Sequence, residues 1–327
     1  MSDRSDRAHV FRQARTHSAT GLEVFRRILA EIDGQVRVLD AFAGDELPKA
    51  PAGSVFVGAG DSYAAALVGF YASGGKCLAV DPYSLASDPR IARGKDVFFI
   101  SASGRTASNV YAAKAVKSEA RSTAALTADE GSPLVEQVSK TFKIPMRYVP
   151  KAPGILSFSL SALAVLFMVG GSLPCDFARA LRAAKEENIE FSLGRGVTYL
   201  LGNSLAYPAS IYAAAKVYEL LGACAHSELL EEFSHLELFS LRKGDAVNVF
   251  GHFDGSGVST KLATALRNNG YVAHVAPAWG RTGTELFFHC VFLAQLWSVG
   301  QARMAGLQRP RFMNRGKQLR ISDMMIY

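Results

Sequence analysis

The stretch DVFFISASGRTASN, from Asp96 to Asn109, decides the fold. Its first half is apolar and rich in Val, Phe and Ile, which is typical of a buried β-strand. Its second half changes abruptly to small hydroxyl residues, with Ser101, Ser103 and Thr106 around a glycine. A strand that ends in such a turn and runs into a helical segment is typical of a βα unit.

The same alternation extends in both directions along the chain. Apolar strands are expected within 54–60, 76–82, 96–104, 122–134, 140–146, 196–203, 245–253 and 271–277. Helical segments are expected at 8–33, 62–73, 108–120, 177–188, 207–222, 257–270 and 285–304. Strands that alternate with helices form right-handed units around a parallel sheet. The fold class is therefore α/β, with two three-layer α/β/α sandwich halves, each with a mainly parallel sheet.

We expect three parts: an N-terminal helical segment at 1–40, a first domain at 41–172 and a second domain at 173–327. The stretch Ile155–Pro174 carries no charge over 20 residues, a length that can span a bilayer. It contains four serines, two adjacent glycines and a final proline, so we predict a helix buried between domains or subunits and no membrane association.

Composition and charge limit the classes of ligand and partner that fit the chain. The chain has 327 residues, 49% of them hydrophobic, and a net charge of +7 that suits an anionic ligand. A basic cluster lies near the C-terminus, but neither an aromatic RNA-binding signature nor a zinc finger accompanies it, so we predict a solvated surface and no nucleic-acid partner. The N-terminus is charged and lacks the apolar core of a signal peptide, which indicates a cytoplasmic protein.

No metal or cofactor is predicted. The four cysteines are far apart, form no CxxC pair and sit among apolar neighbours, which favours buried free thiols. The acidic segment that contains Glu228, Glu231 and Glu232 has no cysteine or histidine pair at ligand spacing, so we interpret it as a solvated turn.

The hydroxyl-rich turn suggests a phosphate site. In a parallel sheet, ligands bind beyond the carboxyl ends of the strands, where helix N-termini offer free N–H donors. A second turn, GAGDSY at 58–63, ends its strand on the same side and adds Ser62. Helix capping is the alternative use of these Ser and Thr residues. Two hydroxyl-rich strand ends in one sheet favour phosphate, while GAGDSY does not fit the dinucleotide pattern GxGxxG.

The motifs GAGDSY at 58–63, ISASGRT at 100–106 and LTADEGSPL at 126–134 resemble those of the sugar isomerase (SIS) domain family. With two such halves, the chain is similar to the isomerase domain of glucosamine-6-phosphate synthase and to archaeal phosphoglucose/phosphomannose isomerases. The resemblance implies one phosphosugar site in the first half. The residues that it assigns to this site are Gly60, Ser62, Ser101, Ala102, Ser103 and Thr106.

The second half adds catalytic candidates. The run from Tyr207 to His235 resembles the synthase pattern, and Lys216, Glu219 and His235 keep its spacings. The resemblance implies that Glu219 is the base that moves a proton between C1 and C2, that His235 opens the sugar ring and that Lys216 binds substrate. It also places the histidine in the site of a neighbouring subunit, so we expect a homodimer with a composite active site. Lys317 is the candidate for a cationic group that the C-terminal segment brings to the sugar.

The chain departs from the pattern in three places. Its second half has no SxSGxT turn of its own, so we expect one phosphate site per subunit. The relatives follow the histidine with Gly-Pro, whereas this chain has Leu236-Glu237, and it lacks the Pro-Arg pair of the phosphoglucose isomerases. On residues alone, Glu219 is a surface carboxylate that pairs with Lys216 three positions earlier.

The expected function is a cofactor-free aldose–ketose isomerase that acts on a hexose 6-phosphate through ring opening and an enediol. The alternatives are an aminosugar-phosphate deaminase or deglycase, and a non-catalytic phosphosugar sensor. Ammonia release separates the deaminase from the isomerase, and the variant Glu219→Gln separates an enzyme from a sensor.

Overall fold

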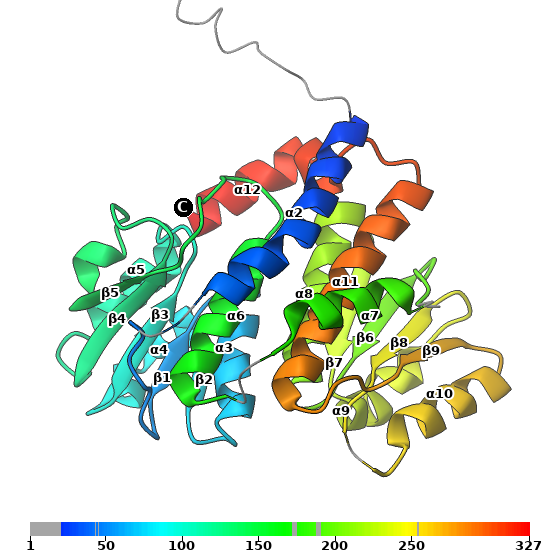
Figure 1. The fold of residues 1–327 in the computed structure, drawn as a ribbon, viewed down its shortest axis with the longest axis horizontal. Coiled ribbons are helices and arrows are strands. Elements are labelled where there is room, and N and C mark those ends of the chain that lie inside the picture. Colours follow the sequence, from blue (N-terminus) through cyan, green and yellow to red (C-terminus); the bar gives the residue numbers. More distant parts are fainter. Residues whose placement is uncertain (1–20, 43, 45, 172–174, 188–190, 254) are drawn as a thin grey trace, which may run out of the picture.

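Figure 1 shows the computed structural model of the chain, which describes residues 21–42, 44, 46–171, 175–187, 191–253 and 255–327. Two separate sheets lie on either side of a central group of helices. The part of the predicted N-terminal helix that precedes Gly21 lies outside the described residues, and α2 (Gly21–Ala41) begins there.

The first sheet contains five parallel strands in the order β2-β1-β3-β4-β5. They are β1 (Val55–Val57), β2 (Leu78–Val80), β3 (Asp96–Ile100), β4 (Ser122–Thr127) and β5 (Lys140–Lys143). Its helical segments are α3 (Asp61–Ala72), α4 (Pro82–Ser87), η1 (Pro89–Ala92), α5 (Ala107–Ala115) and η2 (Val135–Gln137). All five predicted strands are present, and β3 is followed by a polar turn and a helix as the sequence indicated.

The second sheet contains four parallel strands in the order β7-β6-β8-β9. They are β6 (Val197–Leu201), β7 (Cys224–Glu228), β8 (Ala246–Phe250) and β9 (Val272–Ala276). Its helical segments are α8 (Ala206–Lys216), the π-helical turn η3 (Val217–Leu221), α9 (Leu230–His235), η4 (Glu237–Ser240) and α10 (Val258–Asn268). The sequence did not predict the edge strand β7. The acidic segment interpreted as a solvated turn instead forms the end of β7 and helix α9, so that interpretation was wrong. The α/β class with two parallel sheets is confirmed.

Helices α2, α6 (Leu156–Val169), α7 (Phe177–Glu186) and α11 (Gly283–Met304) fill the space between the sheets (Figure 1). Helix α6 packs on α3 and α2, and α11 packs on α7 and α8. One hydrophobic core runs through both halves, and the rings of Phe158 and Tyr212 stack across it with centroids 4.0 Å apart. The apolar stretch is therefore a buried helix, as predicted. In the described part of the chain, no helix is both long and apolar enough to cross a bilayer.

The C-terminal segment forms η5 (Arg311–Asn314) and α12 (Gly316–Ile326). Helix η5 contacts η3 in the second half, and α12 reaches α5 in the first, so this segment bridges the halves at the top of Figure 1. Of the cysteines, Cys77, Cys175 and Cys290 are buried as expected, whereas Cys224 is exposed because it lies on the edge strand β7. For Cys224 the prediction of a buried thiol was wrong.

Candidate active site

The chain turns sharply from β1 into α3. Gly58 has no room for a side chain, since a Cβ there would lie 2.4 Å from the carbonyl oxygen of Ser62. Gly60 has a φ of 58°, in the left-handed region that favours glycine. Because of this tight turn, Asp61 and Ser62 stand in the first turn of α3, at the carboxyl end of the strand.

The turn after β3 is tied together by its own hydroxyl groups. Ser101 Oγ accepts the N–H of Gly104 at 3.1 Å and lies 3.5 Å from Thr106 Oγ1. Ser103 Oγ accepts the N–H of Arg105 at 3.2 Å. Thr106 stands at the N-cap of α5, but its side chain makes no capping hydrogen bond. The capping alternative therefore does not account for Thr106.

The sheet order brings these two turns together. Strands β1 and β3 are neighbours, and the chain leaves them toward opposite edges of the sheet, so their carboxyl ends form the switch point where parallel sheets bind ligands. A cavity of about 100 Å³ lies there. It is lined by Ala59, Asp61, Ser62, Ala102, Ser157, Phe158 and Ser161. Ser157 and Ser161 come from α6, and sequence analysis had not assigned them to the site.

A buried lysine connects this region to the second half. Lys216, at the end of α8, is completely buried, and its Nζ lies 2.9 Å from Asp61 Oδ2 and 2.6 Å from Glu219 Oε2. The ammonium also lies 4.9 Å from the centroid of the Tyr212 ring. The predicted base of the second half is thus linked through one cation to the residue that precedes Ser62.

The pKa values of Lys216 and Glu219 are both raised, but for different reasons. Burial alone lowers the pKa of Lys216, but the Asp61 and Glu219 carboxylates outweigh it and raise the pKa above its ordinary value, so the lysine stays charged. Burial raises the pKa of Glu219 to about 6, against the opposing effect of Lys216 and with a further increase from Asp61. The side chain of Glu219 is 33% exposed, so a ligand can reach it.

Asp61 is the residue that sequence analysis missed. Its Oδ2 accepts from Lys216, while its Oδ1 is buried and has no hydrogen-bond partner within the described protein. Gly154 packs directly on it, and a Cβ at Gly154 would lie 2.4 Å from Oδ2. Tyr212 holds this loop by donating its hydroxyl to the Gly154 carbonyl at 2.9 Å. The sequence signal that could have identified Asp61 is its acidic side chain within the glycine-rich turn GAGDSY.

Glu219 also lines a larger cavity of about 420 Å³ beneath α12. Its polar wall includes Lys151, which pairs with Asp323 at 2.8 Å, and Arg315, whose Nη2 donates to the Gly222 carbonyl at 3.4 Å. Lys317 stands two residues after Arg315, is exposed, and is not part of this wall. The structure therefore brings Arg315 rather than Lys317 to the cavity that Glu219 lines.

His235 ends α9 on the surface. Its Nε2 lies 3.1 Å from Glu231 Oε1, and both side chains are mostly exposed. Among the described residues, no hydrogen bond or ion pair joins His235 to Glu219 or to the turns after β1 and β3. A role in the site of a second subunit stays a prediction.

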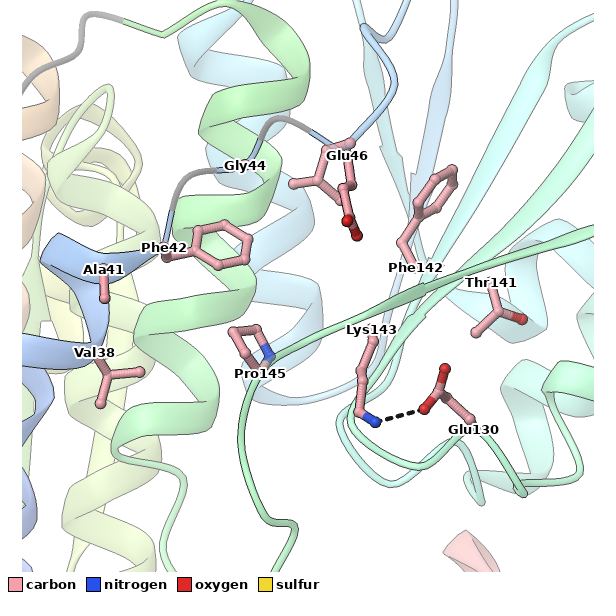
Figure 2. Close-up of a pocket in the computed structure, with 11 residues that line it drawn as sticks. Val38, Ala41, Phe42, Gly44, Glu46, Glu130, Thr141, Phe142, Lys143 and Pro145 are labelled. Carbon is pink, nitrogen blue, oxygen red and sulfur yellow. Dashed lines mark hydrogen bonds and ion pairs between the residues drawn. The ribbon is translucent and has the colours of Figure 1, made fainter.

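Another hollow, of about 570 Å³, lies between the end of α2 and the edge strand β5 (Figure 2). Its two charged groups at the strand, Lys143 and Glu130, pair with each other at 2.6 Å. None of the described residues that line it belongs to the predicted site. We therefore assign the candidate site to the switch point and not to this hollow.

Comparison with known protein families finds a match in the first half of the chain. The SIS domain family model matches residues 53–170, which extend from β1 through α6 and include both polar turns. This confirms the SIS domain predicted for the first half. A comparison with curated proteins found no match.

Solved structures match both halves. The glucosamine-6-phosphate deaminase of Thermotoga maritima is 20% identical, with a TM-score of 0.67 over 86% of this chain and 95% of that one. The tagatose-6-phosphate ketose/aldose isomerase of Escherichia coli is 18% identical, with a TM-score of 0.66 over 87% and 91%. The C-terminal domain of glucosamine-fructose-6-phosphate aminotransferase from Francisella tularensis is 15% identical, with a TM-score of 0.58 over 88% and 97%. At these identities the similarity establishes the fold.

Proposed function

We propose that this chain is a phosphosugar isomerase that interconverts the aldose and ketose forms of a hexose 6-phosphate. The observation that carries this proposal is the buried Lys216, which bonds Asp61 beside the polar turns and Glu219 in η3. A phosphate anchor and a carboxylate with a raised pKa are the two groups that a cofactor-free isomerisation needs most. The SIS domain and the phosphosugar enzymes among the structural neighbours support the substrate class.

The phosphate would bind at the carboxyl ends of β1 and β3. The hydroxyls of Ser62, Ser101, Ser103 and Thr106 can turn toward it as donors, and the backbone at Gly60 and Ala102 adds N–H groups. Hydrogen bonds to a charged phosphate are stronger than those that these hydroxyls make with the backbone. The first turns of α3 and α5 add the partial positive charge of a helix N-terminus.

Glu219 would act as the base. Its carboxylate takes the proton from C2 of the open-chain aldose, and the C–H electrons form a C1–C2 double bond while O1 takes the negative charge. The O2 hydroxyl proton then passes to O1, and the same carboxyl returns the carbon-bound proton to C1 as C2 becomes the carbonyl. A pKa of about 6 leaves the group mostly ionised at neutral pH and still basic enough to accept a proton. Asp61 Oδ1, which has no hydrogen-bond donor among the described residues, would accept a sugar hydroxyl.

Lys216 would act by positioning. Because Lys216 is fully buried, we propose that it acts on the substrate site through Asp61 and Glu219 and not by touching the substrate itself. Its charge compensates Asp61, which would otherwise repel a phosphate dianion at the neighbouring Ser62. It also fixes the carboxylate of Glu219 at 2.6 Å.

His235 and Lys317 complete the proposal. Ring opening by His235 requires a second copy of the chain that brings the end of α9 to the site, and hence a homodimer. Lys317 would reach the sugar only if α12 moves relative to Glu219. Both assignments rest on the motif spacing.

The variant Glu219→Gln tests the base. If wild-type protein turns over a hexose 6-phosphate, Glu219→Gln should reduce kcat by about 10²–10⁴-fold, the usual contribution of a general base, while substrate binding is retained. Glu186→Gln, which changes an exposed carboxylate at the end of α7, is the matched control and should keep full activity. Equal activity of Glu219→Gln and wild type would remove Glu219 from the mechanism.

A deaminase is the alternative enzyme, because the T. maritima structure that matches with a TM-score of 0.67 carries that activity in its name. The same base would form an enolamine from glucosamine 6-phosphate, and ammonia would leave. An ammonia assay on that substrate, beside an assay of ketose formation from aldose phosphates, decides between the two. Binding without turnover on every hexose and hexosamine 6-phosphate would indicate a sensor.

A further inference from the structure

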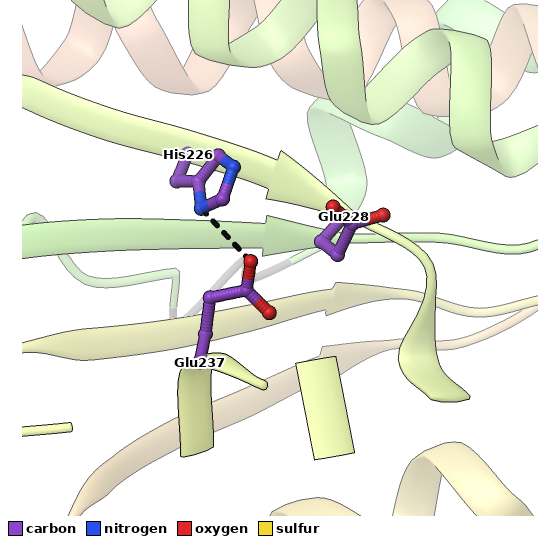
Figure 3. A group of neighbouring side chains, drawn as sticks. All are labelled: His226, Glu228 and Glu237. Atoms are coloured by element: carbon purple, nitrogen blue, oxygen red, sulfur yellow. Dashed lines mark ion pairs between the residues drawn. The ribbon is translucent and has the colours of Figure 1, made fainter. Parts of the chain in front are cut away.

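A second group of titratable side chains lies at the β7 edge of the second sheet (Figure 3). His226 and Glu228 stand two positions apart on the edge strand β7, and therefore on one face of it. Glu237 approaches them from η4, with its Oε1 3.5 Å from His226 Nδ1. One nitrogen or oxygen of each residue lies within 4.8 Å of the others. The cluster shares no residue with the proposed active site.

No lysine or arginine among the described residues balances the negative charge of this cluster. Glu237 Oε2 is buried and has no hydrogen-bond partner within the described protein, and the side chain is only 16% exposed. Glu228 Oε1 accepts the N–H of Leu229 at 2.8 Å. Among the described residues, no lysine or arginine forms an ion pair with either carboxylate. Two neighbouring carboxylates, one with a buried unsatisfied oxygen, favour binding of a cation.

We propose that His226, Glu228 and Glu237 bind one divalent transition-metal ion, for which Zn²⁺ is the best match. An imidazole nitrogen with two carboxylate oxygens is a ligand set that Zn²⁺ accepts, whereas Mg²⁺ prefers oxygen ligands alone. His226 is 48% exposed, so such an ion keeps a coordination position open to water. Sequence analysis predicted no metal because it grouped Glu228 with Glu231 and Glu232, whereas Glu228 ends β7 and the other two lie in α9.

The ion has a structural consequence. It ties η4 to β7, and η4 directly follows α9, the helix that ends in His235. Metal binding therefore fixes the segment that carries His235, whatever reaction the switch-point site performs.

Titration of the full chain with ZnCl2 after removal of metals by EDTA tests this inference by calorimetry. We expect one ion per chain, and about tenfold or greater weakening in His226→Ala and in Glu237→Gln, because loss even of an outer-shell partner costs 10–100-fold. MgCl2 should not compete. The half-exposed His226 can be replaced without a core cavity, and circular dichroism checks the fold of each variant.

Two controls make the assignment specific. Cys224→Ser removes the exposed thiol two residues before His226. Glu231→Gln removes the carboxylate that pairs with His235, a histidine outside the proposed metal site. Both should bind Zn²⁺ as the wild type does. Absence of Zn²⁺ binding, equal binding by His226→Ala and wild type, or loss of binding in Cys224→Ser would overturn the proposal.

Discussion

The first strand-to-helix turns of the two sheets share two backbone features. A Cβ at Gly58 would lie 2.4 Å from the Ser62 carbonyl oxygen, and one at Gly202 would lie 2.5 Å from that of Ala206, four residues on in each case. Two residues after each of these glycines the chain adopts a positive φ, 58° at Gly60 and 53° at Ser204. A tight turn of this kind therefore follows the first strand of each sheet.

The side chains on these turns differ. Where the first half has Asp61 and Ser62, the second has Leu205 and Ala206, both buried and apolar. The same backbone thus presents a carboxylate and a hydroxyl in one half and hydrocarbon in the other. A switch point provides the place for a ligand, and the side chains determine whether it is a site.

The neighbouring strand ends repeat this difference. The N–H of Ser101 donates to the Leu126 carbonyl at 3.0 Å, and that of Gly251 donates to the Ala276 carbonyl at 2.8 Å. A Cβ at Gly251 would lie 2.3 Å from the Ala276 oxygen, so no hydroxyl side chain fits there. This asymmetry supports the prediction of a single phosphate site, to which the second half contributes Lys216 and Glu219 instead.

Removal of the lysine that connects the halves should have the largest effect. Lys216→Met removes a fully buried cation and leaves the partly buried carboxylates of Asp61 and Glu219 side by side, which should lower the free energy of unfolding by about 3–5 kcal/mol. Guanidinium unfolding measures this loss.

An exposed ion pair of the first half is the control. Lys143→Met breaks the pair with Glu130, in which both side chains are more than half exposed, and should cost about 0–1 kcal/mol. If Lys216→Met and Lys143→Met are equally stable, the buried ion pair does not hold the halves together.

Loss of the hydroxyl on the first turn should weaken ligand binding. Ser62→Ala removes a donor to the phosphate, worth about 1.5–3 kcal/mol for a hydrogen bond to a charged group, or roughly 10–100-fold in Kd for hexose 6-phosphate. Ser204→Ala, in the corresponding turn of the second half, should leave the Kd unchanged. Equal effects of the two variants would show that the halves do not differ as proposed.

The shared backbone turn can be tested separately from the ligand. Gly58→Ala and Gly202→Ala each force a methyl group against a carbonyl oxygen, and each should destabilise the fold by about 1–3 kcal/mol in thermal unfolding. Only Gly58→Ala should also weaken hexose 6-phosphate binding. A tolerated Gly202→Ala beside a destabilised Gly58→Ala would mean that the turns are not equivalent.

The smallest expected effect is on the pH dependence of stability. Burial raises the pKa of Glu219 from 4.5 to about 6, so its ionisation opposes folding. Stability that the protonated carboxyl provides is present below pH 4.5 and is lost as the pH rises through about 6. The Tm of Glu219→Gln should therefore increase relative to wild type between pH 4.5 and 6.5 and then level off. A difference in Tm that shrinks over this interval would contradict the raised pKa.

Much of the fold followed from local sequence. Strands such as Asp96–Ile100 are apolar runs that end in glycine or hydroxyl turns, and this punctuation marks parallel strands reliably. Strand β7 was not predicted because CAHSE contains a single buried apolar residue, Ala225. It lies at the sheet edge, where a strand pairs on one side only. A five-residue edge strand has little periodicity to detect.

The site was predictable in parts. The hydroxyls of the two turns followed from their position after strands. Asp61 could not be predicted, because its role depends on an ion pair with Lys216, which lies 155 residues away in the chain. Ser157 and Ser161 were visible as serines in an apolar stretch, but only the packing of α6 on α3 brings them to the cavity. Long-range pairing is the information that spacing does not carry.

A crystal structure with a hexose 6-phosphate bound is the most direct test of the central claim. We predict that the phosphate contacts the hydroxyls of Ser101, Ser103 and Thr106, and that C1 and C2 lie about 3–3.5 Å from the carboxylate of Glu219, the separation at which a proton can be transferred. Phosphate bound at the ends of β6 and β8, or a sugar whose C1 and C2 point away from Glu219, would contradict it.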